Sequence, residues 1–173
     1  MKTILILRHA KSDWGTPDLP DFDRPLAPRG LEDAPRIGQV LARFNCIPDQ
    51  ILASPAQRAR QTAQIAAAAC GYQKSIQWAD DFYGGDSHTL IEALQRLSPS
   101  VERALMVGHN PTMEETVSTL LAGPTEDEAV AIRIPTAGLV CLEVGIADWA
   151  MLQPGQASLR WFLIPKLVKA ITG

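Results

Sequence analysis

Apolar residues recur along the chain with two spacings, one typical of buried strands and one typical of helices, and segments of the two kinds alternate. Short apolar runs that predict strands lie at 3–7, 50–53, 75–78, 104–107, 131–134, 139–144 and 158–164. Apolar positions three and four residues apart predict helices within 30–44, 56–70, 87–97 and 110–121. Such alternation favours a parallel sheet with helices on both faces. We therefore predict an α/β fold, a three-layer α/β/α sandwich around a mostly parallel central sheet.

Proline and small polar residues mark where the predicted helices begin. Pro35 fits the first turn of the first helix, where its missing N–H costs little. Ser54-Pro55 resembles an N-cap followed by proline at the first helical position, and Ser87 can cap the third helix. Asn110-Pro111 begins the fourth helix.

Two segments lack apolar periodicity and are predicted to be loops. Residues 13–30 are rich in Asp, Pro and Gly, and we expect them to flank the end of the first strand, with Asp21, Asp23 and Arg24 in a local charged turn. The second loop surrounds 123–125 and continues into acidic residues at 126–128.

Length and composition limit the classes of protein to which the chain can belong. A chain of 173 residues, with 46% hydrophobic and 20% charged residues, most naturally forms one globular domain over 1–173. A net charge of -3 argues against a general nucleic-acid binder, which would carry a basic excess. Any cationic site is therefore local, and no nucleic-acid partner is expected.

Cysteine usage and the first apolar run indicate the compartment. Cys46, Cys70 and Cys141 are odd in number and widely spaced, which favours reduced core thiols over a disulfide framework. The apolar run before Arg8 is too short for a signal peptide or a membrane span. We expect a cytoplasmic protein without a membrane partner.

Four basic side chains follow the predicted strands, at the positions where the sites of parallel sheets lie. Arg8 and His9 end the first strand. Arg58 lies just beyond the second strand, and His109 follows the strand at 104–107. Ligands of such sheets bind outside the carboxyl ends of the strands. Each residue alone also fits a purely structural role, but together they predict one shared site for an anion such as a phosphoryl group.

Other phosphate chemistries lack their sequence signals. The chain has neither a Gly-x-x-x-x-Gly-Lys-Ser/Thr loop nor a Gly-x-Gly-x-x-Gly fingerprint. None of its cysteines is followed six residues later by arginine, as a cysteine phosphatase would require. A metal site built on His9, His88 and His109 would lack a close cluster of further ligands, and the arginines would repel the ion. We expect neither a metal nor another cofactor.

The chain resembles the histidine phosphatase superfamily in three segments that occur in the right order: Leu7-Arg8-His9-Ala10, Ser54-Pro55-Ala56-Gln57-Arg58-Ala59-Arg60-Gln61-Thr62-Ala63 and Val107-Gly108-His109-Asn110-Pro111. It resembles the phosphohistidine phosphatase SixA branch in its small size and in three further segments: Arg8-His9-Ala10-Lys11-Ser12, Leu26-Ala27-Pro28-Arg29-Gly30 and Pro135-Thr136-Ala137-Gly138. The resemblance implies a phosphoglycerate mutase-like fold.

The resemblance also implies a role for each basic residue. His9 would be the nucleophile that forms a phosphohistidine intermediate, which water then hydrolyses. Three residues would bind the phosphoryl oxygens: Arg8, Arg58 and His109. Ser12 and Thr136 lie in the segments shared with the SixA branch, and they are further candidates for phosphate binding.

Two departures from the superfamily pattern bear on the chemistry. Ala10 replaces the glycine that many members carry after the histidine. Many members also place a glutamate, the general acid, after the third strand, where this chain has Phe82-Tyr83-Gly84-Gly85-Asp86. Asp81 or Asp86 would have to substitute for that glutamate.

The missing glutamate favours a substrate whose leaving group needs no strong acid. Losing a general acid typically costs about 100 to 10,000-fold in rate when a phosphate ester is cleaved. Imidazole, whose conjugate acid has a pKa near roughly 6.5, leaves far more readily. We therefore predict hydrolysis of phosphohistidine in proteins, with inorganic phosphate as the product. Two alternatives stay open: a phosphatase or mutase acting on small or sugar phosphomonoesters, and a non-catalytic phosphate-binding module.

Overall fold

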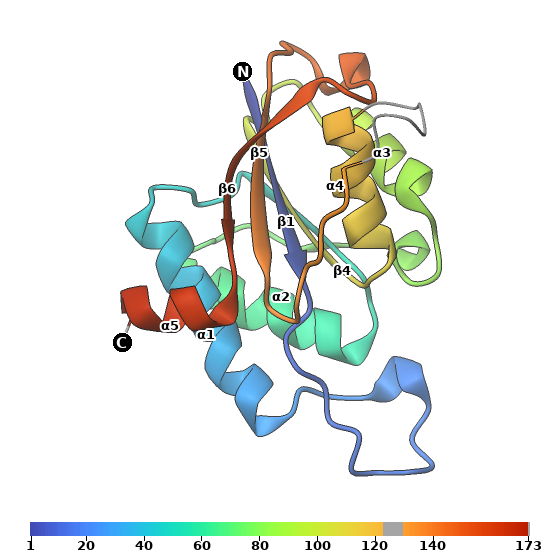
Figure 1. Ribbon diagram of the computed structural model, residues 1–173, viewed down its shortest axis with the longest axis vertical. Coiled ribbons are helices and arrows are strands. Elements are labelled where there is room, and N and C mark those ends of the chain that lie inside the picture. Colours follow the sequence, from blue (N-terminus) through green and yellow to red (C-terminus); the bar gives the residue numbers. More distant parts are fainter. Residues whose placement is uncertain (123–129, 173) are drawn as a thin grey trace.

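A computed structural model describes residues 1–122 and 130–172, which form a six-stranded sheet in the order β3-β2-β4-β1-β5-β6 (Figure 1). The strands of this described part are β1 (Lys2–Arg8), β2 (Gln50–Ala53), β3 (Gln77–Trp78), β4 (Arg103–Gly108), β5 (Leu139–Val144) and β6 (Ala157–Leu163). The α-helices are α1 (Pro28–Arg43), α2 (Gln57–Cys70), α3 (Ser87–Gln95), α4 (Thr112–Ala122) and α5 (Pro165–Thr172). The described part also contains three short 3-10 turns: η1 (Asp21–Asp23), η2 (Asp80–Phe82) and η4 (Trp149–Met151). The loop predicted around 123–125, with the acidic residues 126–128, lies outside the described residues.

Parallel pairing dominates the sheet. β1 pairs with β4, β4 with β2, and β2 with β3, all in parallel. β5 and β6 extend the other side of β1 as antiparallel strands. Parallel strands need long crossover connections, and α1, α2 and α3 supply them. The predicted α/β fold with a mostly parallel sheet is therefore confirmed.

Helices cover both faces of the sheet (Figure 1). Alternate side chains of the central strand β1 enter two separate layers of the core, one on each face. Leu5 and Leu7 pack on the face covered by α1 and α2, whereas Ile4 and Ile6 pack on the face covered by α3 and α4. All four side chains are completely buried. Burial on both faces explains why β1 is a continuous apolar run. The backbone that leads to Arg8 is thus fixed from both sides.

The strand predicted at 131–134 is wrong, because this segment is irregular in the structure. Its apolar pattern has another cause. Ile134 is buried, but its N–H donates to Glu114 Oε1 and its carbonyl accepts from Arg8 and Asn110. Side chains thus take the backbone hydrogen bonds that a neighbouring strand would otherwise take.

The first helix begins earlier than the apolar spacing indicates. Pro28 is the first residue of α1, at the position where a missing N–H costs little. The predicted place of Pro35 in the first turn is therefore wrong, and this residue lies inside the helix. No helix within 1–122 and 130–172 is long and apolar enough to cross a membrane.

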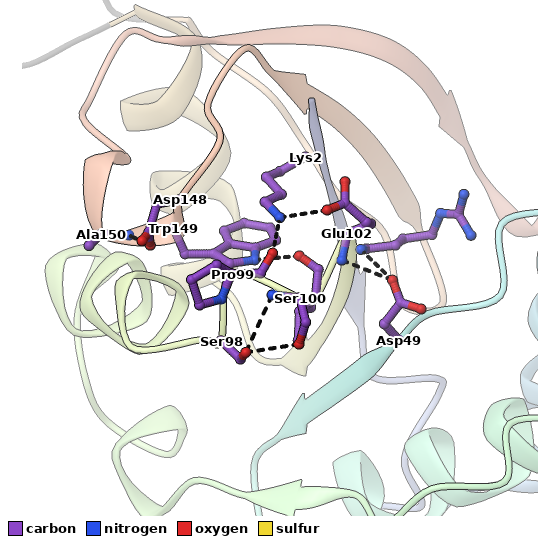
Figure 2. Close-up of polar contacts among 11 residues, drawn as sticks. Lys2, Asp49, Ser98, Pro99, Ser100, Glu102, Asp148, Trp149 and Ala150 are labelled. Atoms are coloured by element: carbon purple, nitrogen blue, oxygen red, sulfur yellow. Dashed lines mark hydrogen bonds and ion pairs between the residues drawn. The ribbon is translucent and has the colours of Figure 1, made fainter.

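A buried lysine holds the amino ends of β1 and β4 (Figure 2). Lys2 is 1% exposed, and its ammonium group donates to the Pro99 carbonyl and, at 2.8 Å, to Glu102 Oε1. The Asp49 carboxylate accepts from the backbone N–H groups of Glu102 and the residue after it. These contacts fix the starts of two strands whose opposite ends carry the candidate site.

Candidate active site

Two histidines lie side by side at the carboxyl edge of the sheet because β1 and β4 pair in parallel. Arg8 at the end of β1 is level with Gly108 at the end of β4. The N–H of His9 donates to the Gly108 carbonyl at 3.0 Å. A histidine therefore follows each strand at the same level, and the ring centroids of His9 and His109 are 5.0 Å apart.

The His9 ring is buried and held in one tautomer. Its Nδ1 lies 2.8 Å from the Ala10 carbonyl oxygen, so this nitrogen carries the proton and donates it. Its Nε2 then has an electron pair, which accepts from Arg58 Nε at 3.3 Å. Burial, and after it the charge of Arg58, lowers the pKa of His9 to about 4 although the Ala10 carbonyl opposes this shift. The ring is therefore neutral at neutral pH.

Helix α2 fixes the segment that holds His9. Thr62 Oγ1 accepts from the Ala10 N–H at 3.0 Å and donates to the Arg58 carbonyl at 2.7 Å. Thr62 and Arg58 are four residues apart and so share one face of the helix. One helical turn thus positions both the backbone next to His9 and the guanidinium beside its Nε2.

Asp21 joins the site although nothing local in the sequence marks it. Arg58 donates its Nη2 to Asp21 Oδ2 at 2.9 Å and its Nη1 to the Asp21 carbonyl, 37 residues away along the chain. Tyr83 donates its hydroxyl to the same Oδ2 at 3.0 Å. Burial favours the neutral acid, but the hydrogen bonds from Arg58 and Tyr83 prevail and lower the pKa of Asp21. The carboxylate is therefore ionised at neutral pH.

His109 is held by a serine that the sequence suggests as a helix cap. The predicted Ser54 cap is wrong, because the N-cap of α2 is Ala56. The Ser54 hydroxyl lies instead 2.8 Å from His109 Nε2. Within the described part of the chain, the buried Nδ1 of His109 has no hydrogen-bond partner. Burial, followed by the nearby His9 and Arg58, lowers the pKa of His109 to about 3, so this ring is also neutral.

Arg8 is positioned by the loop that precedes β5. Its Nη1 donates to the Ile134 carbonyl at 2.9 Å, and its buried Nε has no partner among residues 1–122 and 130–172. The N–H of Ala137 lies 3.1 Å from the carbonyls of both Arg8 and His9. Thr136, the preceding residue, therefore lies in a turn directly beside the end of β1.

Ser12 lies in the loop after β1, and its buried hydroxyl is directed to a surface tryptophan. Trp14 Nε1 donates to Ser12 Oγ at 3.1 Å, and the Trp14 ring stacks on the Arg24 guanidinium 4.4 Å away. The backbone of Ser12 also forms an isolated bridge with Leu26. Ser12 thus supports the loop in the described structure, and its hydroxyl is engaged outside the pair of histidines.

Neither of the predicted acids contacts the two histidines within the residues described. Asp86 is the N-cap of α3 in place of Ser87. It accepts from the Thr89 N–H at 2.9 Å, and this hydrogen bond lowers the pKa of Asp86. Asp81 lies in the turn η2. Asp21, from the loop after β1, is the carboxylate that the structure places against Arg58.

The third histidine is separate from the site. His88 lies on the surface, with its side chain 80% exposed, and its Nε2 is 3.2 Å from Glu92 Oε1. Across the described ranges, no group of three or more His, Cys, Asp or Glu side chains is arranged to hold a metal ion.

Comparisons of the sequence with known proteins point to one family. The family model described as the histidine phosphatase superfamily (branch 1) matches residues 4–82. An uncharacterized protein of Mycobacterium tuberculosis is 39% identical over 165 residues, which cover 92% of this chain and 100% of that protein.

Solved structures share the fold over nearly the whole chain. A candidate phosphohistidine phosphatase SixA from Agrobacterium tumefaciens is 31% identical with a TM-score of 0.75, over 95% of this chain and 99% of that one. Another candidate SixA, from Nakamurella multipartitia, is 28% identical with a TM-score of 0.77, over 95% and 96% of the two chains. The predicted phosphoglycerate mutase-like fold is thereby confirmed.

Proposed function

Because the chain belongs to the histidine phosphatase superfamily, we propose that it removes phosphoryl groups from phosphohistidine in proteins through a covalent intermediate on His9. The observation that carries this proposal is the state of the His9 ring. It is buried and neutral, and its Nε2 electron pair lies beside the Arg58 guanidinium. The similarity to two candidate phosphohistidine phosphatases supports the substrate class.

The first step transfers the phosphoryl group to His9. Nε2 attacks the phosphorus in line with the bond to the leaving nitrogen, and that bond breaks as the Nε2–P bond forms. Nδ1 keeps its proton throughout and donates it to the Ala10 carbonyl. Positive charge develops on the ring during the attack, and the carbonyl and the nearby Asp21 carboxylate both stabilise it.

Three groups are proposed to bind the phosphoryl oxygens: Arg8, Arg58 and His109. The two arginines supply fixed positive charge. His109 contributes in its neutral form, because its Nε2 can accept from the Ser54 hydroxyl while its Nδ1–H donates to an oxygen. This use of Nδ1 accounts for a buried polar atom that lacks a partner among the described residues. A bound phosphoryl dianion also raises the pKa of His109, which strengthens the contact.

The second step returns His9 to its starting form. Water attacks the phosphorus, the Nε2–P bond breaks, and its electron pair returns to Nε2. Inorganic phosphate leaves with the proton that water releases. Because Nδ1 kept its proton, His9 is again neutral and oriented for the next substrate.

The carboxylates of the described chain support phosphohistidine over a phosphate ester. An alkoxide leaving group needs a proton, but Asp86 caps a helix and Asp21 is ionised. A leaving imidazole needs protonation by a general acid far less than an alkoxide does.

We further propose that catalysis needs no metal and takes place in the cytoplasm. Arg8 and Arg58 provide the positive charge that stabilises the phosphoryl group, and they would repel a metal ion. Cys46, Cys70 and Cys141 are free thiols, as expected in a reducing compartment.

A matched pair of peptides tests the proposal. One peptide carries phosphohistidine and the other carries phosphoserine at the same position, and phosphate release is measured for both. We expect kcat/KM for the phosphohistidine peptide to be higher by at least about 100-fold. His9→Ala abolishes turnover, whereas His88→Ala, a control at an exposed histidine, retains it.

Each contrary result removes a different part of the proposal. Preference for the phosphoserine peptide contradicts the substrate, and full activity of His9→Ala contradicts the nucleophile. Bound phosphate without turnover of either peptide or of an aryl phosphate would support a phosphate-binding module instead.

A further inference from the structure

A carboxylate with one unused oxygen faces the candidate site from the loop after β1. The turn η1 places Asp21, whose Oδ2 accepts from both Arg58 and Tyr83. Within residues 1–122 and 130–172 no group donates to its Oδ1, and the side chain is 45% exposed. Asp21 can therefore accept a further hydrogen bond from a molecule that enters the site.

The groups around Asp21 keep it ionised. Arg58 and Tyr83 donate hydrogen bonds to it, and His9 and His109 face it from the two strand ends. Both histidines are neutral, so Arg58 is the cation in direct contact. An ionised carboxylate has no proton to give to a leaving group. It can only accept a proton, or accept a hydrogen bond from a proton that another molecule carries.

Flat aromatic side chains lie next to this carboxylate. The Tyr83 ring meets the His109 ring edge-on, with 5.6 Å between the centroids. Phe22, the neighbour of Asp21, meets the Tyr83 ring edge-on at 5.0 Å. Phe22 and Tyr83 are also partly exposed. Aromatic rings beside a carboxylate suit a flat cation, and a protonated imidazole is such a cation.

We propose that Asp21 accepts the ring N–H of the phosphorylated histidine and holds that ring as an imidazolium, an inference that rests on the proposed function. As the His9 Nε2–P bond forms, the P–N bond of the substrate breaks. Its electron pair stays on the leaving nitrogen, while the other ring nitrogen keeps its proton. The product is a neutral imidazole, and the positive charge passes to the His9 ring. No general acid is needed, because the required proton arrives with the substrate.

Asp21→Asn tests this role, with Asp23→Asn in the same turn as the matched control. Each protein is assayed with a phosphohistidine peptide and with p-nitrophenyl phosphate, which has no ring proton. Both substrates depend on His9 and Arg58, so the ratio of their kcat/KM values isolates the contact with the leaving ring. We expect Asp21→Asn to lower the ratio of phosphohistidine to aryl phosphate about 10- to 100-fold. Asp23→Asn leaves the ratio unchanged.

The pH profile gives a second readout that a purely structural role would not move. A carboxylate beside the bound ring raises the pKa of that ring, which extends phosphohistidine turnover to higher pH. In Asp21→Asn the alkaline limb of kcat moves to lower pH by about one unit, and the aryl phosphate shows no such shift.

The outcomes separate this role from the proposed function. If the wild type hydrolyses phosphohistidine and Asp21→Asn changes neither the ratio nor the alkaline limb, the role of Asp21 alone is overturned. If the wild type hydrolyses the aryl phosphate but not phosphohistidine, the proposed substrate is overturned, and this role with it.

Discussion

The neutral state of His9 makes the folded protein less stable in acid. In the folded protein the pKa of His9 is about 4, mainly because burial disfavours the charged ring, whereas the ordinary value is 6.5. Between these two values the unfolded chain binds a proton on this residue and the folded protein does not. Above 6.5 neither state is protonated, so the stability contribution of His9 is lost only as the pH falls from 6.5 to about 4.

The size of this loss follows from the difference between the two pKa values. A difference of roughly 2.5 pH units, at about 1.4 kcal/mol for each unit, corresponds to about 3 kcal/mol. His9 is 7% exposed, so solvent screens its charge little. A typical domain is stable by about 5–15 kcal/mol, and the loss is large on that scale.

His9→Gln isolates this effect because it removes the titrating ring and keeps a polar side chain. Urea unfolding of the wild type and the variant is measured from about pH 7 to about pH 4. The difference between their unfolding free energies cancels the titrating groups that do not interact with His9, and we expect it to fall by about 3 kcal/mol in favour of the variant. His88→Gln, at an exposed histidine, shows no such fall. A constant difference between the wild type and His9→Gln would refute the neutral, buried state of His9.

Two further predictions concern residues that hold the site from a distance. Glu114→Ala removes the acceptor of the Ile134 N–H and so loosens the Ile134 carbonyl that holds Arg8. We expect KM for an aryl phosphate to rise about tenfold in this variant and to stay within about threefold of the wild type in Glu114→Gln, which keeps an acceptor. A normal KM in Glu114→Ala would argue against the link between Glu114 and Arg8. Lys2→Ala leaves a cavity at the far end of β1 and lowers the free energy of unfolding by about 2 kcal/mol, whereas Lys2→Met keeps the volume and changes it by less than about 1 kcal/mol. Chemical denaturation measures both variants, and equal destabilisation would show that the charge of Lys2, not its volume, matters.

The residues at the strand ends can be predicted from the sequence because the signal for each lies in the residues directly before it. An apolar run precedes both His9 and His109, and the parallel pairing of β1 with β4 brings such ends to one edge. Arg58 lies in the first turn of α2, which follows β2 after a short connection, and therefore at the same edge of the sheet. Local patterns therefore predicted the two histidines and the arginine between them, together with the order of strands and helices that delivers them.

The contacts that complete the site depend on distant parts of the chain and have no local signal. Asp21 lies in a loop without apolar periodicity, and its partner Arg58 is 37 residues away. Ser54 precedes a proline as a helix cap often does, but its hydroxyl is engaged by His109 instead. The segment before β5 has the apolar pattern of a strand, yet Glu114 takes the Ile134 N–H. At Ser54 and Ile134 a tertiary hydrogen bond overrides the local preference.

Transfer of a labelled phosphoryl group from a phosphohistidine peptide to the protein tests most directly the claim that His9 Nε2 attacks the substrate. The reaction is quenched in alkali within a single turnover, and the labelled residue and ring nitrogen are identified. We expect an acid-labile, base-stable label on Nε2 of His9 that is absent from His9→Ala. A label on another residue, or one that persists in His9→Ala, would contradict it.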